Sequence, residues 1–279
     1  MVTNPNVKIN LGLNILRKRE DGFHDLETLF VPYSGIHDTL EIVVGDDYSR
    51  TSAALFAKYA PEMIAQGISE DGKLMITIAR AEGVDWDPLK DLTAKAYYIL
   101  AEDFKLPPVK IFLEKTSPVG AGLGGGSADA AFALKMLDEL CELNLTEHQL
   151  AGYAARLGSD CAFFVYNRPM IGEGRGEILT EYPLDLSQYD LQVLAPEGVA
   201  VSTREAYAGI RPHLPETSLR EALARPVEEW SQLLVNDFEE TVFVNHPELA
   251  AIKRSLYDCG AVYASMSGSG SALFALYRK

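Results

Sequence analysis

A glycine-rich stretch, TSPVGAGLGGGSADAA at residues 116–131, has the residue types and spacing best suited to chemistry. Five glycines lie between Gly120 and Gly126, and Ser127 and a run of alanines follow them. Glycine backbone lets N–H groups approach a phosphate closely, the N-terminus of a following helix attracts the same anion, and the Ser127 hydroxyl suits a phosphate oxygen or Mg²⁺. A tight packing contact is the alternative, but it seldom needs five glycines before one helix. The stretch therefore predicts a phosphate-binding loop.

Two familiar nucleotide motifs can be read into this loop, and neither fits. Gly120, Gly122 and Gly125 spell G-x-G-x-x-G, while residues 120–127 spell G-x-x-x-x-G-G-S, with glycine where a P-loop needs lysine. A dinucleotide-binding fold also needs a strand after the loop helix, with an acidic residue about twenty residues on. Residues 147–157 predict a second helix there instead. The loop is therefore expected to bind phosphate in another kind of fold.

The elements that must position the loop follow from hydrophobic periodicity. Residues 7–15 alternate apolar and polar side chains, so they predict a strand with Lys8 and Asn10 on its polar face, and the Asp21-Gly22 turn should send the chain back through 26–33. Further strands are predicted at 38–44, 73–79, 109–115, 161–166, 190–196, 260–265 and 271–278. Helices are predicted at 88–104, 127–143, 147–157, 218–224, 226–234 and 246–257; Thr146 and Gln149 form a capping box and Gly158 ends the third of these. Strands and helices do not alternate regularly, which favours an α+β fold over a doubly wound sheet.

Composition excludes several classes of function. The net charge of −15 argues against a non-specific nucleic-acid binder or a membrane-surface protein, because phosphate-rich surfaces would repel it. Three cysteines without a C-x-x-C pair fit buried free thiols in a reducing compartment. The N-terminus has no apolar signal region and the chain no apolar run of membrane length. We expect a cytoplasmic protein with a small-molecule partner, no nucleic acid and no membrane; the sequence leaves monomer and homodimer open.

Several segments together resemble the GHMP kinases, a family that includes galactokinase, homoserine kinase and mevalonate kinase. The loop PVGAGLGGGSADAA is similar to the family's phosphate loop, P-x-x-x-G-L-G-S-S-A. Its triple-glycine form is closer to the branch that acts on a cytidine diphosphate ester in bacterial isoprenoid synthesis. Four other segments resemble that branch in the same order: VKINLGLNILRKREDGFHDLETLF, LGSDCAFFV, GEGRGEIL and MSGSGSALFAL.

The resemblance implies a fold and a reaction. It implies an N-terminal ATP-binding domain like domain 2 of ribosomal protein S5 over residues 1–156, and a C-terminal ferredoxin-like α/β sandwich domain for the substrate over 157–279. The implied reaction moves the γ-phosphoryl group of ATP, with Mg²⁺, to the 2-hydroxyl of 4-(cytidine 5′-diphospho)-2-C-methyl-D-erythritol. This is a step of the non-mevalonate, or methylerythritol phosphate, isoprenoid pathway.

The resemblance also implies roles for individual residues. Asp160 matches the catalytic base, and Lys8 matches the lysine that keeps it ionised, although a helix cap and a solvated strand residue remain the plainer alternatives. Phe23 and Tyr207 match aromatic rings that stack on cytosine, and His24 matches a hydrogen-bond partner of the base edge, with an ordinary exposed histidine as its alternative. Asn10 and Thr203 match positions near the substrate. The residues matched to nucleotide binding are Lys115, Pro118, Gly120, Gly122, Leu123, Gly124, Gly125, Gly126 and Ser127, with Ser127 also a Mg²⁺ ligand.

Three departures and two rivals qualify this interpretation. Asp91 stands where asparagine is frequent near the adenine, Ala162 where proline is usual, and Phe23 where tyrosine is common. Lys115 has a second interpretation as a sheet-edge residue that keeps the surface soluble. The rival functions are another small-molecule kinase of this family, such as homoserine kinase, and a ligand sensor without catalysis. The DGFH aromatic–histidine pair argues against the first, and the retained Lys8 and Asp160 against the second.

Overall fold

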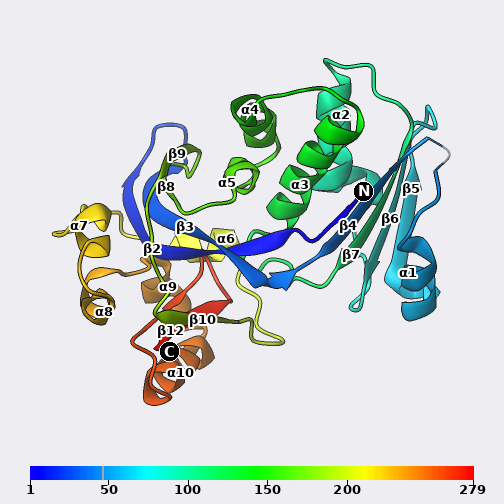
Figure 1. Cartoon of the computed structure of the whole chain (residues 1–279). Coiled ribbons are helices and arrows are strands. Elements are labelled where there is room, and N and C mark those ends of the chain that lie inside the picture. Colours follow the sequence, from blue (N-terminus) through cyan, green and yellow to red (C-terminus); the bar gives the residue numbers. More distant parts are fainter. Residues whose placement is uncertain (46) are drawn as a thin grey trace. The chain divides into compact units, whose positions relative to one another are not determined.

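The strand that leads into the glycine loop, β7 (Val109–Lys115), lies inside a five-stranded sheet in the order β1-β4-β7-β6-β5. The computed structural model describes residues 1–45 and 47–279 (Figure 1). β7 pairs with β6 in parallel and with β4 in antiparallel register. It is therefore a central strand, so the sheet-edge interpretation of Lys115 is wrong. The other strands of this sheet are β1 (Val2–Thr3), β4 (Thr39–Val44), β5 (Ile64–Ile68) and β6 (Leu74–Arg80).

The polypeptide divides into two compact units, and neither is one continuous stretch. Unit 1 comprises residues 1–7, 34–119 and 124–167, and unit 2 comprises 8–33, 120–123 and 168–279. The chain therefore passes between the units five times, and two of these crossings lie within the glycine-rich stretch. The domain boundary predicted after residue 156 stays a prediction.

Helices of unit 1 pack against one another beside the sheet (Figure 1). Asp91 caps the helix that precedes β7, accepting a hydrogen bond from the backbone N–H of Thr93 at 2.9 Å. The predicted capping box of Thr146 and Gln149 is confirmed, as is the stop at Gly158. The helical elements are α1 (Ser52–Lys58), η1 (Pro61–Met63), η2 (Pro88–Lys90), α2 (Leu92–Ala101), α3 (Gly125–Leu140), α4 (Glu147–Leu157) and α5 (Cys161–Tyr166).

The strand predicted at 161–166 is wrong, because these residues form α5. Its sequence, CAFFVY, is apolar throughout and has no period that separates a buried strand from a buried helix. Five of its six residues are buried, and it packs on α3 and α4. Burial on every side explains why a short helix can be uniformly apolar. Asn167, with a φ of 50°, ends it in the left-handed conformation.

Unit 2 is built on two antiparallel sheets, ordered β2-β3-β8-β9 and β10-β12-β11. A core around Ile15, Phe238, Met266 and Leu273 joins strands of both sheets to α6, α9 and α10. The sequence did not predict β8, β9, α6 or α9. The bounds are β2 (Asn6–Lys18), β3 (His24–His37), β8 (Met170–Gly174), β9 (Ile178–Glu181), β10 (Tyr189–Leu194), α6 (Thr203–Ala208), α7 (Leu219–Leu223), η3 (Val227–Glu229), α8 (Trp230–Leu233), α9 (Phe238–Asn245), α10 (Pro247–Asp258), β11 (Tyr263–Met266) and β12 (Leu273–Arg278).

Two further sequence expectations concern cysteines and membranes. All three cysteines are free thiols, but only Cys161 is buried: Cys141 is half-buried and Cys259 is exposed, so the expected burial of all three is wrong. Among the residues that the structure describes, no helix combines the length and the apolar character that a membrane crossing requires.

Candidate active site

The glycine loop adopts a conformation that depends on its glycines. Gly122 and Gly124 have φ values of 77° and 73°, in the left-handed region that side chains disfavour. Gly124 is the N-cap of α3, which begins at Gly125, two residues before the predicted start at Ser127. Gly126 and Ser127 therefore lie in the first helical turn, where backbone N–H groups have no partner within the helix. This turn combines unsatisfied donors with the positive end of the helix dipole, which suits a phosphate group.

Within unit 2, the first half of the loop is anchored to the strand that carries Lys8. The Gly122 carbonyl oxygen accepts hydrogen bonds from Lys8 Nζ at 2.9 Å and from Ser267 Oγ at 3.0 Å, and the Lys8 N–H donates to the Leu123 carbonyl at 2.9 Å. A Cβ at Gly122 would lie 2.1 Å from the Ser267 carbonyl oxygen. The close approach of two backbones thus requires glycine at 122.

Lys8 is not the solvated strand residue that the plainer interpretation supposed. It is 3% exposed, and its Nζ donates to Asn10 Oδ1 at 2.6 Å. Asn10 in turn donates from Nδ2 to Thr28 Oγ1 at 3.1 Å, which fixes the orientation of its amide. The structure therefore brings together two of the predicted residues, Lys8 and Asn10, with the carbonyl of a third, Gly122. An ammonium in a buried position acts on nearby negative charge more strongly than it would in water.

The second half of the loop rests on a buried cluster within unit 1. Lys115 Nζ lies 2.6 Å from Asp38 Oδ2 and 2.6 Å from Asp129 Oδ2, and donates to Ser117 Oγ at 3.3 Å. Burial opposes the charge of Lys115, but Asp129 and Asp38 outweigh it and raise its pKa. Burial is also the main reason that the pKa of Asp129 is well above its usual value, and the ammonium of Lys115 only partly counters it. We call these four residues, Asp38, Lys115, Ser117 and Asp129, the lysine cluster.

Asp160 occupies the N-cap position of α5 without making a side-chain cap, so the helix-cap alternative does not describe it. Its Oδ1 accepts a hydrogen bond from Ser159 Oγ at 3.3 Å, and the side chain is half-buried. Its neighbour Cys161 adjoins Ser127: burial raises the pKa of the Cys161 thiol to about 11, and a hydrogen bond with the Ser127 side chain opposes that shift. The start of α3 and the start of α5 therefore meet within unit 1. Asp160 and Lys8 belong to different units, and their catalytic roles stay predictions.

The predicted base-binding residues, Phe23, His24 and Tyr207, all belong to unit 2. The His24 ring stacks on Tyr207, with centroids 4.8 Å apart and an interplanar angle of 22°. Tyr207 also forms a T-shaped contact with Phe238, with centroids 4.8 Å apart and an interplanar angle of 81°. Phe23 is 55% exposed, and the Arg175 guanidinium lies 5.1 Å from its ring centroid. Burial is the first cause, and Lys18 the second, of the lowered pKa of His24, so the ring is neutral at pH 7.

The remaining predicted residues take three different positions. Thr203 is exposed at the start of α6, with its Oγ1 3.5 Å from Ser269 Oγ in the glycine-rich C-terminal segment. Pro118 is half-buried and Gly120 exposed at the beginning of the loop. Asp91, the departure from asparagine, is engaged within its own unit: it caps α2 and its Oδ2 accepts from Trp86 Nε1 at 3.1 Å. These are acceptor roles, so a carboxylate serves there as well as an amide.

Sequence reasoning missed Asp38, Asp129 and Ser267. Asp129 carried a signal, because a single charge in the run SADAAFAL is unusual on an otherwise buried helix face. Asp38 carried none, since its partner Lys115 lies 77 residues away in the chain. Ser267 lies in the MSGSGS segment, which the sequence analysis used only for its resemblance to the family, without a role for this serine.

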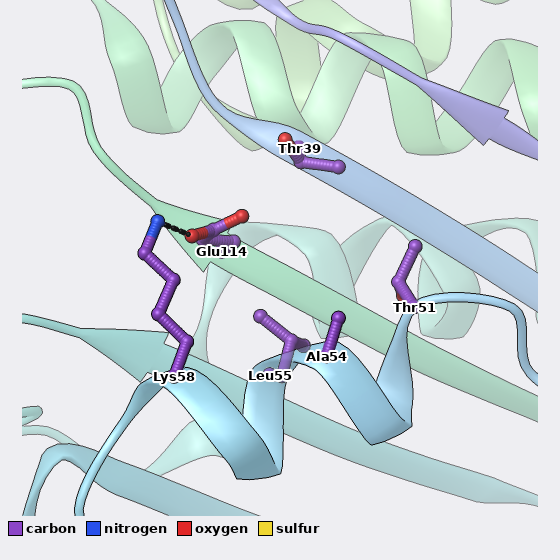
Figure 2. A pocket seen from close by; sticks show the side chains of 6 residues that line it. All are labelled: Thr39, Thr51, Ala54, Leu55, Lys58 and Glu114. Carbon is purple, nitrogen blue, oxygen red and sulfur yellow. Dashed lines mark hydrogen bonds and ion pairs between the residues drawn. The ribbon is translucent and has the colours of Figure 1, made fainter.

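A cavity away from the glycine loop and the other candidate site residues lies under α1, on the face of β7 opposite Lys115. It encloses about 150 Å³ and is lined by Thr39, Thr51, Ala54, Leu55, Lys58 and Glu114. Figure 2 shows Lys58 reaching across it to Glu114, with Nζ and Oε1 2.6 Å apart. Because this ion pair satisfies both charges and no predicted site residue lines the space, the cavity does not compete with the glycine loop as the candidate site.

The oxygen atom that Ser127 offers near the loop suits a magnesium ion that is bound together with a nucleotide. Within 1–45 and 47–279, no group of three or more His, Cys, Asp or Glu side chains is arranged to hold a metal. Ser127 offers one hydroxyl at the first turn of α3. Mg²⁺ commonly takes one or two protein oxygens and completes its shell with substrate phosphates and water. A single hydroxyl beside a phosphate-binding turn fits that pattern.

Comparison with known proteins was made by family, by sequence and by structure. The GHMP kinases N terminal domain matches residues 91–168, and the GHMP kinases C terminal domain matches 219–279. A 4-diphosphocytidyl-2-C-methyl-D-erythritol kinase of Bacteroides thetaiotaomicron is 48% identical over 277 residues, covering 99% of this chain and 92% of its own. The enzyme of the same name from Porphyromonas gingivalis is 40% identical over 282 residues, with coverages of 100% and 93%.

The structural matches agree with these relatives. A crystal structure of 4-(cytidine 5′-diphospho)-2C-methyl-D-erythritol kinase aligns with a TM-score of 0.75 and 29% identity, covering 99% of this chain and 90% of that one. A homoserine kinase from Cytophaga hutchinsonii aligns with a TM-score of 0.65 over 99% of this chain and 86% of its own, at 16% identity. The second likeness shows a shared α+β fold and nothing about the substrate.

Proposed function

Because this chain belongs to the 4-diphosphocytidyl-2-C-methyl-D-erythritol kinases, a branch of the GHMP kinases, we propose that it carries out their reaction. ATP gives its γ-phosphoryl group to the 2-hydroxyl of 4-(cytidine 5′-diphospho)-2-C-methyl-D-erythritol, a step of the non-mevalonate isoprenoid pathway. The observation that carries this proposal is the glycine loop, which ends in the first turn of α3 and whose Gly122 carbonyl is bonded to the buried Lys8. Phosphoryl transfer depends chiefly on positioning and charge neutralisation, which these features supply.

In this proposal the loop holds the ATP phosphates. The N–H groups of the first turn of α3 donate to phosphate oxygens, and the left-handed glycines leave the backbone accessible. Mg²⁺ bound with ATP neutralises phosphate charge, and the Ser127 hydroxyl is the protein oxygen that would hold it. Pro118, Leu123 and the other loop residues shape this cradle.

Asp160 and Lys8 are proposed to act on the acceptor hydroxyl. A carboxylate can accept the proton of the attacking hydroxyl as the new oxygen–phosphorus bond forms. A nearby ammonium favours the ionised carboxylate and steadies the developing negative charge on oxygen. Two features support these roles: Asp160 makes no helix cap, and Lys8 is buried with its Nζ fixed by Asn10. Asn10 then orients Lys8, and we propose that it also contacts the substrate.

The cytidine end of the substrate is proposed to bind the rings of unit 2. Phe23 and Tyr207 supply faces on which a pyrimidine can stack, a contact that contributes about 1–3 kcal/mol per base in nucleic-acid proteins. Neutral His24 can both donate to and accept from a base edge. Thr203 is proposed to contact the diphosphate or the sugar. This base-binding set favours a nucleotide-linked substrate over homoserine, which has no ring to stack.

One assay separates the proposal from its rivals. Purified protein with Mg²⁺–ATP is given 4-(cytidine 5′-diphospho)-2-C-methyl-D-erythritol, homoserine or no acceptor, and ADP release is followed. We expect turnover with the cytidine substrate alone. Turnover with homoserine would support the rival kinase, and nucleotide binding without ADP release would support a sensor. We also propose a cytoplasmic location, which the three free thiols support.

A further inference from the structure

The lysine cluster joins the two ends of the phosphate loop. Lys115 is the last residue of the strand entering the loop, and Asp129 lies in the second turn of the helix leaving it. Their side chains meet at 2.6 Å, so a buried ion pair closes a ring of chain that contains the whole loop. We infer that the lysine cluster is a positioning unit, in which Lys115 holds the loop ready for ATP through Asp129 and Asp38 instead of touching the nucleotide.

The hydrogen bonds of Lys115 support this role. An ammonium group has three donors, and those of Lys115 are directed to Asp38, Asp129 and Ser117. The Lys115 residue is 6% exposed. No donor is left for a phosphate while these bonds persist, and releasing the ammonium would leave two buried carboxylates without their cation.

Asp38 fixes the entry to the loop from a third segment. Its Oδ1 accepts from the backbone N–H groups of Thr116 and Ser117, at 2.6 and 2.7 Å, and its Oδ2 also accepts from Ser117 Oγ at 2.6 Å. Four donors thus converge on this carboxylate when Lys115 is included, and they satisfy a group that is 0% exposed. The residues that open the loop are held before any ligand binds.

The first turn of α3 lies directly on the cluster. A Cβ at Gly125 would be 2.3 Å from Ser117 Oγ and 3.4 Å from Lys115 Nζ. The glycine therefore lets the phosphate-binding turn touch the side chains that fix it. Loop ends fixed in this way lower the ordering cost that nucleotide binding must overcome.

The inference rests on the proposed function, and binding of Mg²⁺–ADP tests it directly. Titration calorimetry would compare the wild type with Lys115→Met, Asp129→Ala and the double variant. Each single change should weaken ADP binding about tenfold, the scale of one charge-assisted hydrogen bond, and the double variant should be no weaker than the worse single variant because both remove the same tether. The KM for the cytidine substrate should stay near the wild-type value. Asp129→Asn should recover most of the loss, since its amide oxygen still accepts from Lys115.

Two results would overturn the inference. Unchanged ADP binding in Asp129→Ala would show that the Lys115–Asp129 ion pair does not hold the loop. Losses of affinity that multiply in the double variant would show that Lys115 contacts the nucleotide directly. Where circular dichroism shows that Lys115→Met does not fold, the contrast in ADP affinity between Asp129→Ala and Asp129→Asn decides.

Glu41→Gln is the matched control. Glu41 is 1% exposed in the same unit and accepts hydrogen bonds from Ser49 and Thr51. The variant should change thermal stability without changing ADP affinity. Wild-type protein that binds ADP without phosphorylating the cytidine substrate would overturn the function and leave this test intact.

Discussion

Gly122 and Gly120 form a matched pair for testing the phosphate loop. Both have positive φ, 77° and 74°, so alanine at either position carries the same backbone penalty of about 1–2 kcal/mol. They differ in surroundings: a Cβ at 120 meets nothing within 4 Å, whereas a Cβ at 122 lies 2.1 Å from the Ser267 carbonyl oxygen. Backbone must therefore move in Gly122→Ala, and overpacking of this kind typically costs about 1–3 kcal/mol more.

The extra cost should appear in stability and in rate. At about 2–4 °C per kcal/mol for a chain of this size, Gly122→Ala should lower the Tm by several degrees beyond Gly120→Ala. The Gly122 carbonyl also holds Lys8 Nζ at 2.9 Å, so its displacement moves the proposed catalytic ammonium. A displacement of about 1 Å can lower kcat about 10²-fold, while Gly120→Ala should lower kcat less than tenfold.

Circular dichroism melts and steady-state ADP release would measure both quantities on the two variants. Equal losses of Tm and kcat in the pair would show that the Ser267 contact does not constrain the loop. A larger loss in Gly120→Ala would show that the loop is anchored elsewhere.

Three further predictions concern catalysis and the base pocket. Asp160→Asn should lower kcat by about 10²–10⁴ while calorimetry finds ADP and substrate binding intact, and near-native kcat would exclude a base at this position. Tyr207→Ala should raise the substrate KM about tenfold with the ATP KM unchanged, whereas Phe23→Tyr keeps its ring face and should be nearly neutral; parallel changes in both KM values would indicate a folding defect instead. Because burial lowers the pKa of His24 from its ordinary value of 6.5, its neutral form persists above pH 6.5, so the substrate KM should be flat from pH 7 to 8 and rise only at lower pH, where the ring gains a proton. His24→Gln should abolish that rise, and a rise that persists would assign it to another group.

Elements with a local cause could be predicted from the sequence. The strand at 109–115 has clear apolar character, and α4 has its own capping box and terminal glycine, so both were predicted closely. α5 was mistaken for a strand because its six apolar residues carry no period, and only packing on α3 and α4 decides its form. Strand β9 was missed because three of its four residues are exposed, which leaves little hydrophobic signal.

The candidate site divides in the same way. The glycine loop could be recognised from the sequence, because left-handed backbone before a helix favours glycine over every other residue type. The lysine cluster could not be foreseen, because Lys115 read alone is an ordinary charged residue at the end of a strand. Its burial becomes evident only when the fold brings Asp38 and Asp129 to it, 77 residues before and 14 residues after it in the chain.

The stacked pair of His24 and Tyr207 has a consequence for affinity. One face of Tyr207 is already covered by the His24 ring, with centroids 4.8 Å apart. Cytosine stacked on that face would take the place of the His24 ring, so His24 must move aside before the base binds. The protein must also spend part of its time with the rings separated, and a pocket open in about a tenth of the molecules binds about ten times more weakly than one always open. A substitution at 24 that keeps the polar edge but removes the ring's attraction for Tyr207 would therefore bind the base faster than the wild type does.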